Sequence, residues 1–238
     1  MFTAKRTIRY SECGRDGRLT ISGIVNHFQD TSTEHSESLG VGVDFMKSIH
    51  RAWILASWQI CICRRPENGE AVEVQTWPTG FKGIYGDRNY AMRDAKGEVL
   101  AYANSIWIYL NTESGRPDRI ASEVAEKYQN EPPYEMEYAP RKIVVSKMEP
   151  TRESFPIRRY HLDTNDHVNN GKYVEMAMEY VPENFTVRQL RVEYKKAALM
   201  GDEVFPRVSK EEHCIFVDLC DKEGQSFATT EWIGEYEE

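Results

Sequence analysis

An internal repeat constrains the fold of this chain more than any other feature of its sequence. The segment Asp94–Ala101 (Asp-Ala-Lys-Gly-Glu-Val-Leu-Ala) resembles Asp221–Ala228 (Asp-Lys-Glu-Gly-Gln-Ser-Phe-Ala), and both have the pattern of a D-x-x-G turn that enters a strand. Further upstream, Gly69–Val72 resembles Gly201–Val204, again as a turn that opens a strand. Because the matches keep the same order, the sequence predicts two copies of one folding unit.

Each copy is expected to contain one main helix. In the first copy, apolar residues recur at helical spacing over 24–39, with Ser22 as the N-cap and Gly40 as the stop. In the second copy, an apolar stripe covers 173–181, and Pro182 ends it because proline cannot continue a helix.

A run of strands is expected after each helix, because Trp, Val, Ile and Tyr are frequent there. One helix followed by antiparallel strands, twice, is an α+β pattern in which each helix lies across one face of a curved sheet. The expected strands are 52–63, 71–79, 87–94 and 99–110 in the first copy and 187–195, 203–209, 214–221 and 226–236 in the second.

These elements divide the chain into three parts. We expect an N-terminal half at 1–112 and a C-terminal half at 141–238. Between them, residues 113–140 form a linker that contains a polar helical stretch at 120–129 and then Pro132-Pro133. A chain of 238 residues is long enough for each half to bury a core of its own.

The composition excludes several classes of protein. Five Trp, thirteen Tyr and nine Phe exclude a disordered chain, and a net charge of −8 argues against a sequence-independent grip on nucleic acid. Apolar runs stay far below the roughly 20 residues that cross a bilayer. The N-terminal residues 1–6 (Met-Phe-Thr-Ala-Lys-Arg) lack the apolar stretch of a secretory signal, so we expect a soluble, unexported protein.

Cysteine usage predicts a reducing compartment. The chain has five cysteines, an odd number, and Cys61 and Cys63 lie two apart in an expected strand. Their side chains then point to the same face and cannot close an unstrained bridge. His and Cys do not cluster at zinc spacing, so neither a metal nor another cofactor is expected.

The stretch His-Leu-Asp-Thr-Asn-Asp-His-Val-Asn-Asn-Gly-Lys-Tyr at 161–173 is the part of the chain most typical of a catalytic site. If it is extended, Asp163, Asn165 and His167 project to one face, because side chains alternate with period two. A carboxylate, an amide that donates and accepts, and an imidazole that moves protons near neutral pH then converge.

A helix start follows directly, with Asn169 or Asn170 as the N-cap. Its free N–H groups and positive dipole end then point towards the same place. A group that activates water, beside donors that hold a developing oxyanion, is what acyl transfer to water requires.

The simpler interpretation is a turn and a cap before an amphipathic helix. The repeat argues against it, because Asp16–Gly23 resembles Asp163–Asn170 and starts its helix without Asn or His. One copy is thus expected to be a scaffold and the other the site. In this alignment Asp16 corresponds to Asp163, Arg18 to Asn165 and Thr20 to His167.

The sequence resembles the acyl-acyl carrier protein thioesterases, a family with plant plastid and bacterial members. The resemblance covers nearly the whole chain, and its motifs fall in family order. They are Trp53-Ile-Leu-Ala, the Gly69–Pro78 strand, the Arg93-Asp94 hairpin, Ser105-Ile-Trp107, D-x-N-x-H-V-N-N-x-x-Y at 163–173, and Val192-Glu-Tyr-Lys-Lys.

The resemblance implies a tandem double hot-dog fold and hydrolysis of fatty acyl-carrier-protein thioesters to free fatty acid in fatty acid biosynthesis. It maps the catalytic residues onto Asp163, Asn165 and His167. The expected supporting residues are Asn169, Asn170 and Tyr173. Plant members carry a further Glu, followed by Cys, where this chain has Ala197-Ala198, so a mechanism that depends on either residue cannot hold unchanged.

The residues suggest a mechanism with two versions. Asp163 is a general base, or a nucleophile that passes through an anhydride. Asn165 holds the water or the thioester carbonyl, His167 orients or protonates, and N–H groups of the helix start supply the oxyanion site. Glu193 lies near the Ala197-Ala198 pair in sequence but at a different motif position, and we assign it no role.

The expected partner is an acyl carrier protein with a phosphopantetheine-linked acyl chain. Carrier proteins and this chain are both acidic, so docking requires local basic clusters. Arg158-Arg159, just before the motif, is the first choice, and Lys195-Lys196 is a further candidate. The acyl chain is expected in the first copy, near a strand whose Trp53 and Trp58 are equally typical of an ordinary core.

Other functions remain open at this point. They are a coenzyme A thioesterase, a dehydratase on the same fold, and a non-catalytic module that senses acyl thioesters. Plastid members carry a transit extension that this chain lacks, which favours a bacterial cytoplasmic protein. The two copies are expected to pack as a pseudo-dimer, which leaves a homodimer open.

Overall fold

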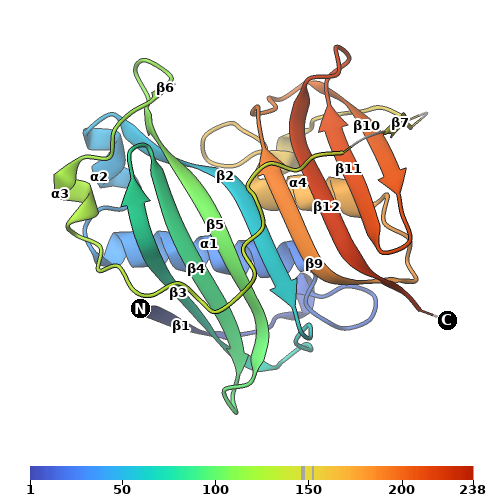
Figure 1. Cartoon of the computed structure of the whole chain (residues 1–238), viewed down its shortest axis with the longest axis horizontal. Coiled ribbons are helices and arrows are strands. Elements are labelled where there is room, and N and C mark those ends of the chain that lie inside the picture. Colours follow the sequence, from blue (N-terminus) through green and yellow to red (C-terminus); the bar gives the residue numbers. More distant parts are fainter. Residues whose placement is uncertain (146–147, 152, 238) are drawn as a thin grey trace. The chain divides into compact units, whose positions relative to one another are not determined.

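The structure, a computed structural model, describes residues 1–145, 148–151 and 153–237 (Figure 1). The chain folds as two compact units, of which the first comprises Met1–Ala56 and Ile62–Tyr138 and the second Ser57–Cys61 and Ala139–Glu238. Each unit contains a main helix and an antiparallel sheet. The predicted α+β fold with two hot-dog halves is confirmed.

The sheet of the first unit has the strand order β1-β3-β4-β5-β2, and β6 pairs with β5. The expected strands of this half are confirmed to within a few residues, whereas β1 and α2 were not predicted. The elements are β1 (Phe2–Thr7), η1 (Tyr10–Glu12), α1 (Ile21–Ser38), α2 (Val43–Ser48), β2 (Arg51–Ile62), β3 (Ala71–Lys82), β4 (Tyr85–Asp94), β5 (Val99–Asn111), β6 (Arg116–Pro117) and α3 (Ser122–Ala125).

In the second unit, residues 57–61 of β2 pair with β9, and the order continues β9-β12-β11-β10-β7, with β8 beside β10. The expected strands of this half are confirmed as well. The elements are β7 (Glu149–Pro150), β8 (Phe155–Pro156), η2 (Arg159–His161), α4 (Asn170–Met178), β9 (Phe185–Tyr194), β10 (Glu203–Lys210), β11 (Cys214–Cys220) and β12 (Ser226–Tyr236).

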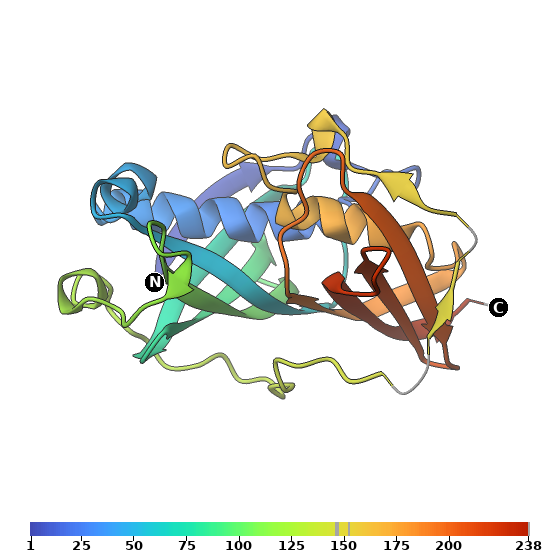
Figure 2. The same ribbon diagram turned by 90° about the horizontal axis from the view of Figure 1, so that it is seen from above.

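Helix α1 lies along one face of its sheet, as Figure 2 shows. Its apolar stripe is buried, and the ring of Phe28 packs against Tyr90 of β4 at 5.1 Å between centroids. The N-cap is Thr20, whose hydroxyl accepts the Gly23 N–H at 3.0 Å, so the prediction of Ser22 was wrong. Gly40 has φ +71°, which confirms the predicted stop, because glycine adopts this conformation without strain.

Helix α4 is half as long as α1, with nine residues against eighteen. It packs against β11 and β12, and Val174 and Ala177 bury its apolar face. The helix ends at Met178, before the end of the predicted stripe at 181, so Pro182 lies beyond the helix rather than directly at its end.

The hairpins of the predicted repeat are the same turn. In one, an oxygen of Asp94 accepts backbone N–H groups at 2.9 Å, and Gly97 has φ +85°. In the other, Asp221 accepts the equivalent N–H groups at 3.1 and 2.8 Å, and Gly224 has φ +78°. The repeat is therefore confirmed at the level of individual hydrogen bonds.

Residues 129–138 run along the face of the first sheet that is opposite α1 (Figure 2). Trp77 donates its indole N–H to the Pro132 carbonyl at 3.0 Å, and the buried Asn89 accepts the Tyr134 N–H at 3.0 Å. The expected helix at 120–129 is only the single turn of α3. Residues 113–138 thus group with the first unit. Within the described part of the chain, no helix is long and apolar enough to span a membrane.

Candidate active site

The stretch that carries Asp163, Asn165 and His167 is a tight turn between η2 and α4. The Asp163 N–H donates to the His167 carbonyl at 2.8 Å, and Asp166 at the tip has φ +59°. The expectation of an extended segment was therefore wrong. The side chains share one turn because the chain reverses there, and Asp is among the residues that tolerate a positive φ.

The Asp163 carboxylate is held in place by the backbone of its own turn. Its Oδ1 accepts the N–H groups of Asn165 at 2.7 Å and of His167 at 3.3 Å. No described residue donates a hydrogen bond to the other oxygen, Oδ2. The carboxylate is half-buried and thus has a fixed orientation with one oxygen available.

The side chains of Asn165 and His167 are exposed. Neither the Asn165 carboxamide nor the His167 imidazole has a hydrogen-bond or ion-pair partner among the residues that the structure describes. One donor and one proton carrier are therefore available to a ligand beside the Asp163 carboxylate.

The start of α4 is already capped. Asn169 is the N-cap, as one of the two predicted alternatives, and its side chain accepts the Gly171 N–H at 2.8 Å. Its carbonyl accepts the Lys172 N–H at 2.9 Å. These two N–H groups are occupied, so they cannot supply the oxyanion site that the sequence suggested, and the Asn165 carboxamide is the better candidate donor.

Two tyrosines tie the motif to the loop after β9. The buried Tyr173 hydroxyl accepts the Ala198 N–H at 2.8 Å, and burial raises the pKa of Tyr173 to about 12, so it stays protonated. Tyr194 donates its hydroxyl hydrogen to the Asn170 carbonyl at 3.1 Å. The Val168 N–H also bonds to the Ala198 carbonyl at 3.2 Å, so the Ala197-Ala198 pair lies beside the motif.

Glu193 lies on the face of the second sheet that is opposite α4. Its carboxylate accepts the Ile143 N–H at 3.1 Å, whereas the next residue, Tyr194, contacts α4. Neighbouring residues of a strand point to opposite faces, so Glu193 points away from α4 and from the motif. It cannot replace a carboxylate at Ala197.

The basic residues near the motif differ in how they are paired. Lys195 contacts Thr229 at 2.9 Å, and Lys196 lies 3.0 Å from a carboxylate oxygen of Asp221. Arg158 and Arg159 are exposed, and neither side chain has a carboxylate partner within the described residues. This pair is the unneutralised positive charge next to the turn.

The first unit contains the same backbone turn, at 14–20. The Gly14 N–H donates to the Arg18 carbonyl at 2.9 Å, as Asp163 does to His167, and Gly17 at the tip has φ +73°. The predicted register was therefore wrong by two residues. In the structure Gly14 corresponds to Asp163, Asp16 to Asn165, Arg18 to His167 and Thr20 to Asn169.

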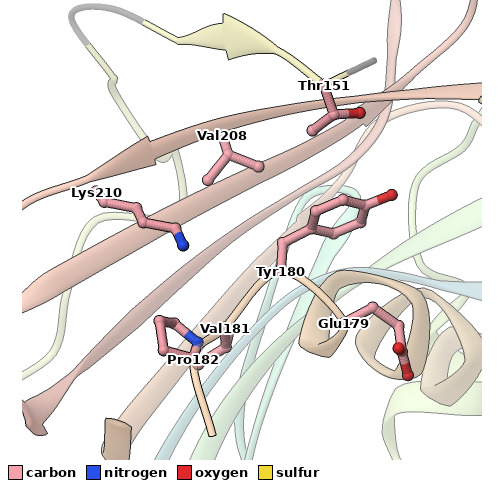
Figure 3. Close-up of a pocket in the computed structure, with 7 residues that line it drawn as sticks. All are labelled: Thr151, Glu179, Tyr180, Val181, Pro182, Val208 and Lys210. Atoms are coloured by element: carbon pink, nitrogen blue, oxygen red, sulfur yellow. The ribbon is translucent and has the colours of Figure 1, made fainter. Parts of the chain in front are cut away.

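A surface hollow of about 410 Å³ lies in the second unit, at the other end of α4 from the turn. Tyr180 and Lys210 point into the space between the end of α4 and β10 (Figure 3). The hollow opens beyond the C-terminal end of α4, and none of the motif residues lines it. It is thus separate from the candidate site.

Comparison with solved structures supports the fold. The structure described as an acyl-ACP thioesterase from Bacteroides thetaiotaomicron matches with a TM-score of 0.90 at 23% identity, over 98% of this chain and 97% of that one. The 12:0-ACP thioesterase from Umbellularia californica matches with a TM-score of 0.85 at 23% identity, over 99% and 97%.

Curated relatives include the chloroplastic palmitoyl-acyl carrier protein thioesterase of Cuphea hookeriana, 29% identical over 82% of this chain and 51% of that protein. The oleoyl-acyl carrier protein thioesterase 1 of Arabidopsis thaliana is 27% identical over 85% and 62%. The chain thus spans about half to three fifths of the length of these relatives.

Two family descriptions match consecutive parts of the sequence. The acyl-ACP thioesterase N-terminal domain covers residues 1–128, and the acyl-ACP thioesterase C-terminal domain covers residues 145–233. Together they account for most of the chain, and the second contains the turn with Asp163, Asn165 and His167. The chain therefore belongs to the acyl-ACP thioesterase family.

Proposed function

We propose that this protein hydrolyses the thioester of a fatty acyl-acyl carrier protein and releases free fatty acid and the carrier protein thiol. The observation that carries the proposal is a contrast between the turn at 14–20 and the turn that contains Asp163. The two turns have the same backbone hydrogen bonds and different side chains. Gly14 shows that the turn forms without a carboxylate at the position of Asp163. The Asp163 carboxylate is thus available for chemistry. We infer thioester hydrolysis as the reaction from membership of the acyl-ACP thioesterase family.

The first step is attack on the thioester carbonyl carbon. Asp163 Oδ2 takes a proton from a water molecule, whose oxygen then bonds to that carbon and forms a tetrahedral oxyanion. The bonds from Asn165 N–H and His167 N–H to Oδ1 keep the carboxylate oriented during the transfer. The Asn165 carboxamide donates to the oxyanion, where a preorganised donor stabilises the transition state most.

The second step is collapse of the tetrahedral intermediate. The C–S bond breaks, the electron pair leaves with the sulfur, and the proton taken from water is returned to the thiolate through His167. The net reaction consumes one water and yields a carboxylic acid and a thiol. Tyr173 supports this geometry through its bond to the Ala198 N–H, and Asn169 and Asn170 support it through the cap and the bond from Tyr194.

Asp163 has a second conceivable role, as a nucleophile that forms an anhydride with the acyl group. The two routes differ in whether an oxygen of water enters Asp163 when the anhydride is opened at the Asp163 carbonyl carbon. A single turnover in ¹⁸O-labelled water labels only the fatty acid if Asp163 is a base, whereas label in the Asp163 carboxylate identifies a nucleophile whose anhydride water opens at that carbon. Mass spectrometry of the peptide that contains Asp163 reads the difference.

We also propose that the first half holds the acyl chain. In this half an apolar cluster forms around α2 and α3, and Trp53 packs against Tyr109 at 5.0 Å between ring centroids. Trp58 is 2% exposed and is a core residue. The buried residues of the cluster are Val41, Met46, Tyr109, Val124 and Tyr128.

We propose Arg158 and Arg159 as the docking site for the acidic carrier protein. Their side chains are exposed and unneutralised, whereas Lys195 and Lys196 are engaged within the fold. A local positive cluster attracts an acidic partner even when the whole chain is acidic. The reaction is assigned to the bacterial cytoplasm as part of the same proposal.

Incubation of the protein with a mixed pool of acyl-carrier-protein thioesters tests the function. The expected products, read by mass spectrometry, are free fatty acids and carrier protein thiol in equal amounts. Turnover of acyl-coenzyme A alone would instead identify a coenzyme A thioesterase. Loss of water from a β-hydroxyacyl chain would identify a dehydratase, and binding without any product would identify a sensor.

A further inference from the structure

His161 holds the catalytic turn at both of its ends. Its Nδ1 accepts the Arg158 N–H at 3.0 Å, at the beginning of η2. Its carbonyl accepts the N–H of Asn169, the N-cap of α4, at 2.9 Å. The residues between these contacts include Asp163, Asn165 and His167, so the side chain and backbone of one residue contact both ends of the turn.

The first unit has the same two hydrogen bonds, with a different side-chain acceptor. Glu12 accepts the Arg9 N–H at 2.7 Å through its carboxylate, and its carbonyl accepts the Thr20 N–H at 3.0 Å. Glu12 and His161 thus occupy equivalent positions in equivalent turns. In both units this position supplies an acceptor, and in the first unit that acceptor is a carboxylate.

The two acceptors respond differently to pH. An imidazole accepts a hydrogen bond only while it is neutral, because both ring nitrogens are donors in the cation. His161 is 7% exposed, and the groups that face it are Arg158 and the Tyr160 ring from its own element and Lys172 and Glu175 from α4. Burial, Lys172 and Arg158 lower its pKa, and Glu175 opposes them, so His161 is a neutral acceptor near pH 7.

We propose that His161 is a positioning residue for the hydrolysis: its neutral imidazole holds the turn that orients Asp163, Asn165 and His167, and protonation of the imidazole releases that turn. The inference rests on the proposed function. It assigns to His161 no contact with the substrate. Sequence reasoning did not select this residue, although an Arg followed three residues later by an acceptor side chain occurs in both copies, as Arg9-x-x-Glu12 and Arg158-x-x-His161.

The test compares two substitutions at His161 with one in the first unit. His161→Ala removes the acceptor and is expected to lower kcat about 10- to 100-fold per folded molecule, with KM within about 3-fold, because small displacements of catalytic groups have effects of this size. His161→Glu restores the acceptor found at Glu12 and is expected to keep kcat within about 3-fold of the parent at pH 7. Glu12→Ala removes the same bond in the first unit and leaves kcat unchanged.

The pH profile separates positioning from mere stability. The ratio of the kcat of His161→Glu to that of the parent is expected to rise as the pH falls from 6.5 to about 5, because the parent loses its acceptor and a carboxylate does not. The ratio cancels titrations that both proteins share. A constant ratio, or a His161→Glu variant no more active than His161→Ala, would overturn the proposal.

Failure of this inference is distinguishable from failure of the proposed function. If the parent releases fatty acid and His161→Ala is equally active per folded molecule, the positioning role is wrong and the function stands. If the parent hydrolyses no thioester, the backbone amide resonances of Asn165 and His167 still test the turn. They are expected to shift in His161→Ala and to remain near the parent positions in His161→Glu; unchanged resonances in both variants would also overturn the proposal.

Discussion

The two halves of this protein share one turn and use it differently. In the first half the turn before the helix carries Gly14, Asp16 and Arg18, and in the second half the equivalent positions carry Asp163, Asn165 and His167. The backbone hydrogen bonds that close the turn are the same in both. Because the backbone is common, the side chains of the second half are not required for the fold of the turn.

The difference also appears in what the side chains contact. In the first turn the Asp16 carboxylate forms an ion pair with Arg65, and Glu12 lies 3.4 Å from the buried His27. In the second turn, Asn165 and His167 have no side-chain partner among the described residues. A turn that serves as scaffold satisfies its polar groups within the protein, whereas a turn that serves as a site leaves them for a ligand.

Among single substitutions, the largest effect is expected from Asp163→Asn. The substitution is nearly isosteric and removes the charge that a base or nucleophile requires, so turnover should fall by about 10²–10⁴. The melting temperature should stay near that of the parent, because an amide oxygen still accepts the N–H groups of the turn. Turnover and melting are measured on the same preparation, and full activity per folded molecule would show that the carboxylate has no chemical role.

A matched pair of substitutions tests whether the Asn165 carboxamide is the oxyanion donor. Asn165→Ala removes the proposed oxyanion donor and should lower kcat by about 10²–10³, the range for loss of one such donor. Asp16→Ala changes the equivalent residue of the first turn and should leave kcat within about 2-fold, at a stability cost of about 0–1 kcal/mol for a half-exposed ion pair. Combining Asn165→Ala with Asp163→Asn should lower kcat by less than the product of the two effects. Equal losses from both alanine variants would remove the distinction between the turns.

In the first half, the buried neutral imidazole of His35 makes the stability of the protein depend on pH. His35 accepts from Arg88 at 3.0 Å, and burial together with the Arg88 charge lowers the pKa of His35 to about 4. Its folded pKa lies below the unfolded value near 6.5, so the stability it contributes is present above pH 6.5 and is lost as the pH falls towards 4. By pH 5 the loss is about 2 kcal/mol.

The variant His35→Gln keeps an acceptor and cannot titrate. Its free energy of unfolding, measured with denaturant at pH 7 and pH 5, should therefore fall less than that of the parent, and its kcat at pH 7 should be unchanged. An equal fall in both proteins would show that His35 does not titrate in this range. A fall in kcat at pH 7 would show that His35 takes part in the reaction, beyond the acyl-chain binding proposed for the first half.

The smallest effect is expected at the docking pair. Reversing the charge of Arg158 and Arg159 to Glu should raise KM for an acyl-carrier-protein substrate about 10-fold, and the effect should weaken at high salt. Hydrolysis of a small soluble acyl thioester should change little. Equal losses on both substrates would indicate a defect of the turn itself, because the Arg158 N–H belongs to its first hydrogen bond.

The two main helices, the main strands and the repeated hairpins were predictable from the sequence, because each is set by local periodicity or by a turn residue such as Gly97 or Gly224. Strand β1 was not, because it is a short edge strand that carries the adjacent charged residues Lys5 and Arg6 and pairs only with β3 among the described strands. Such a strand lacks the apolar run that marks a buried one.

The candidate residues of the site were predictable, but the register of the repeat was not. Asp16 resembles Asp163 in type, which shifted the alignment by two residues, whereas the backbone pairs Gly14 with Asp163. Thr20 and Ser22 are both good caps, and the shape of the turn selects Thr20. A residue's role in a turn depends on hydrogen bonds across it, which type alone does not reveal.

The most direct test of the account replaces the side chains of the second turn with those of the first. The triple variant Asp163→Gly, Asn165→Asp, His167→Arg copies the side chains of Gly14, Asp16 and Arg18 onto the equivalent backbone and leaves Asp166 unchanged. Turnover of acyl-carrier-protein thioester per folded molecule is the quantity to measure, beside the melting temperature. The account predicts a folded protein whose turnover has fallen to the uncatalysed background. A folded variant that still releases fatty acid at a rate near that of the parent would contradict it.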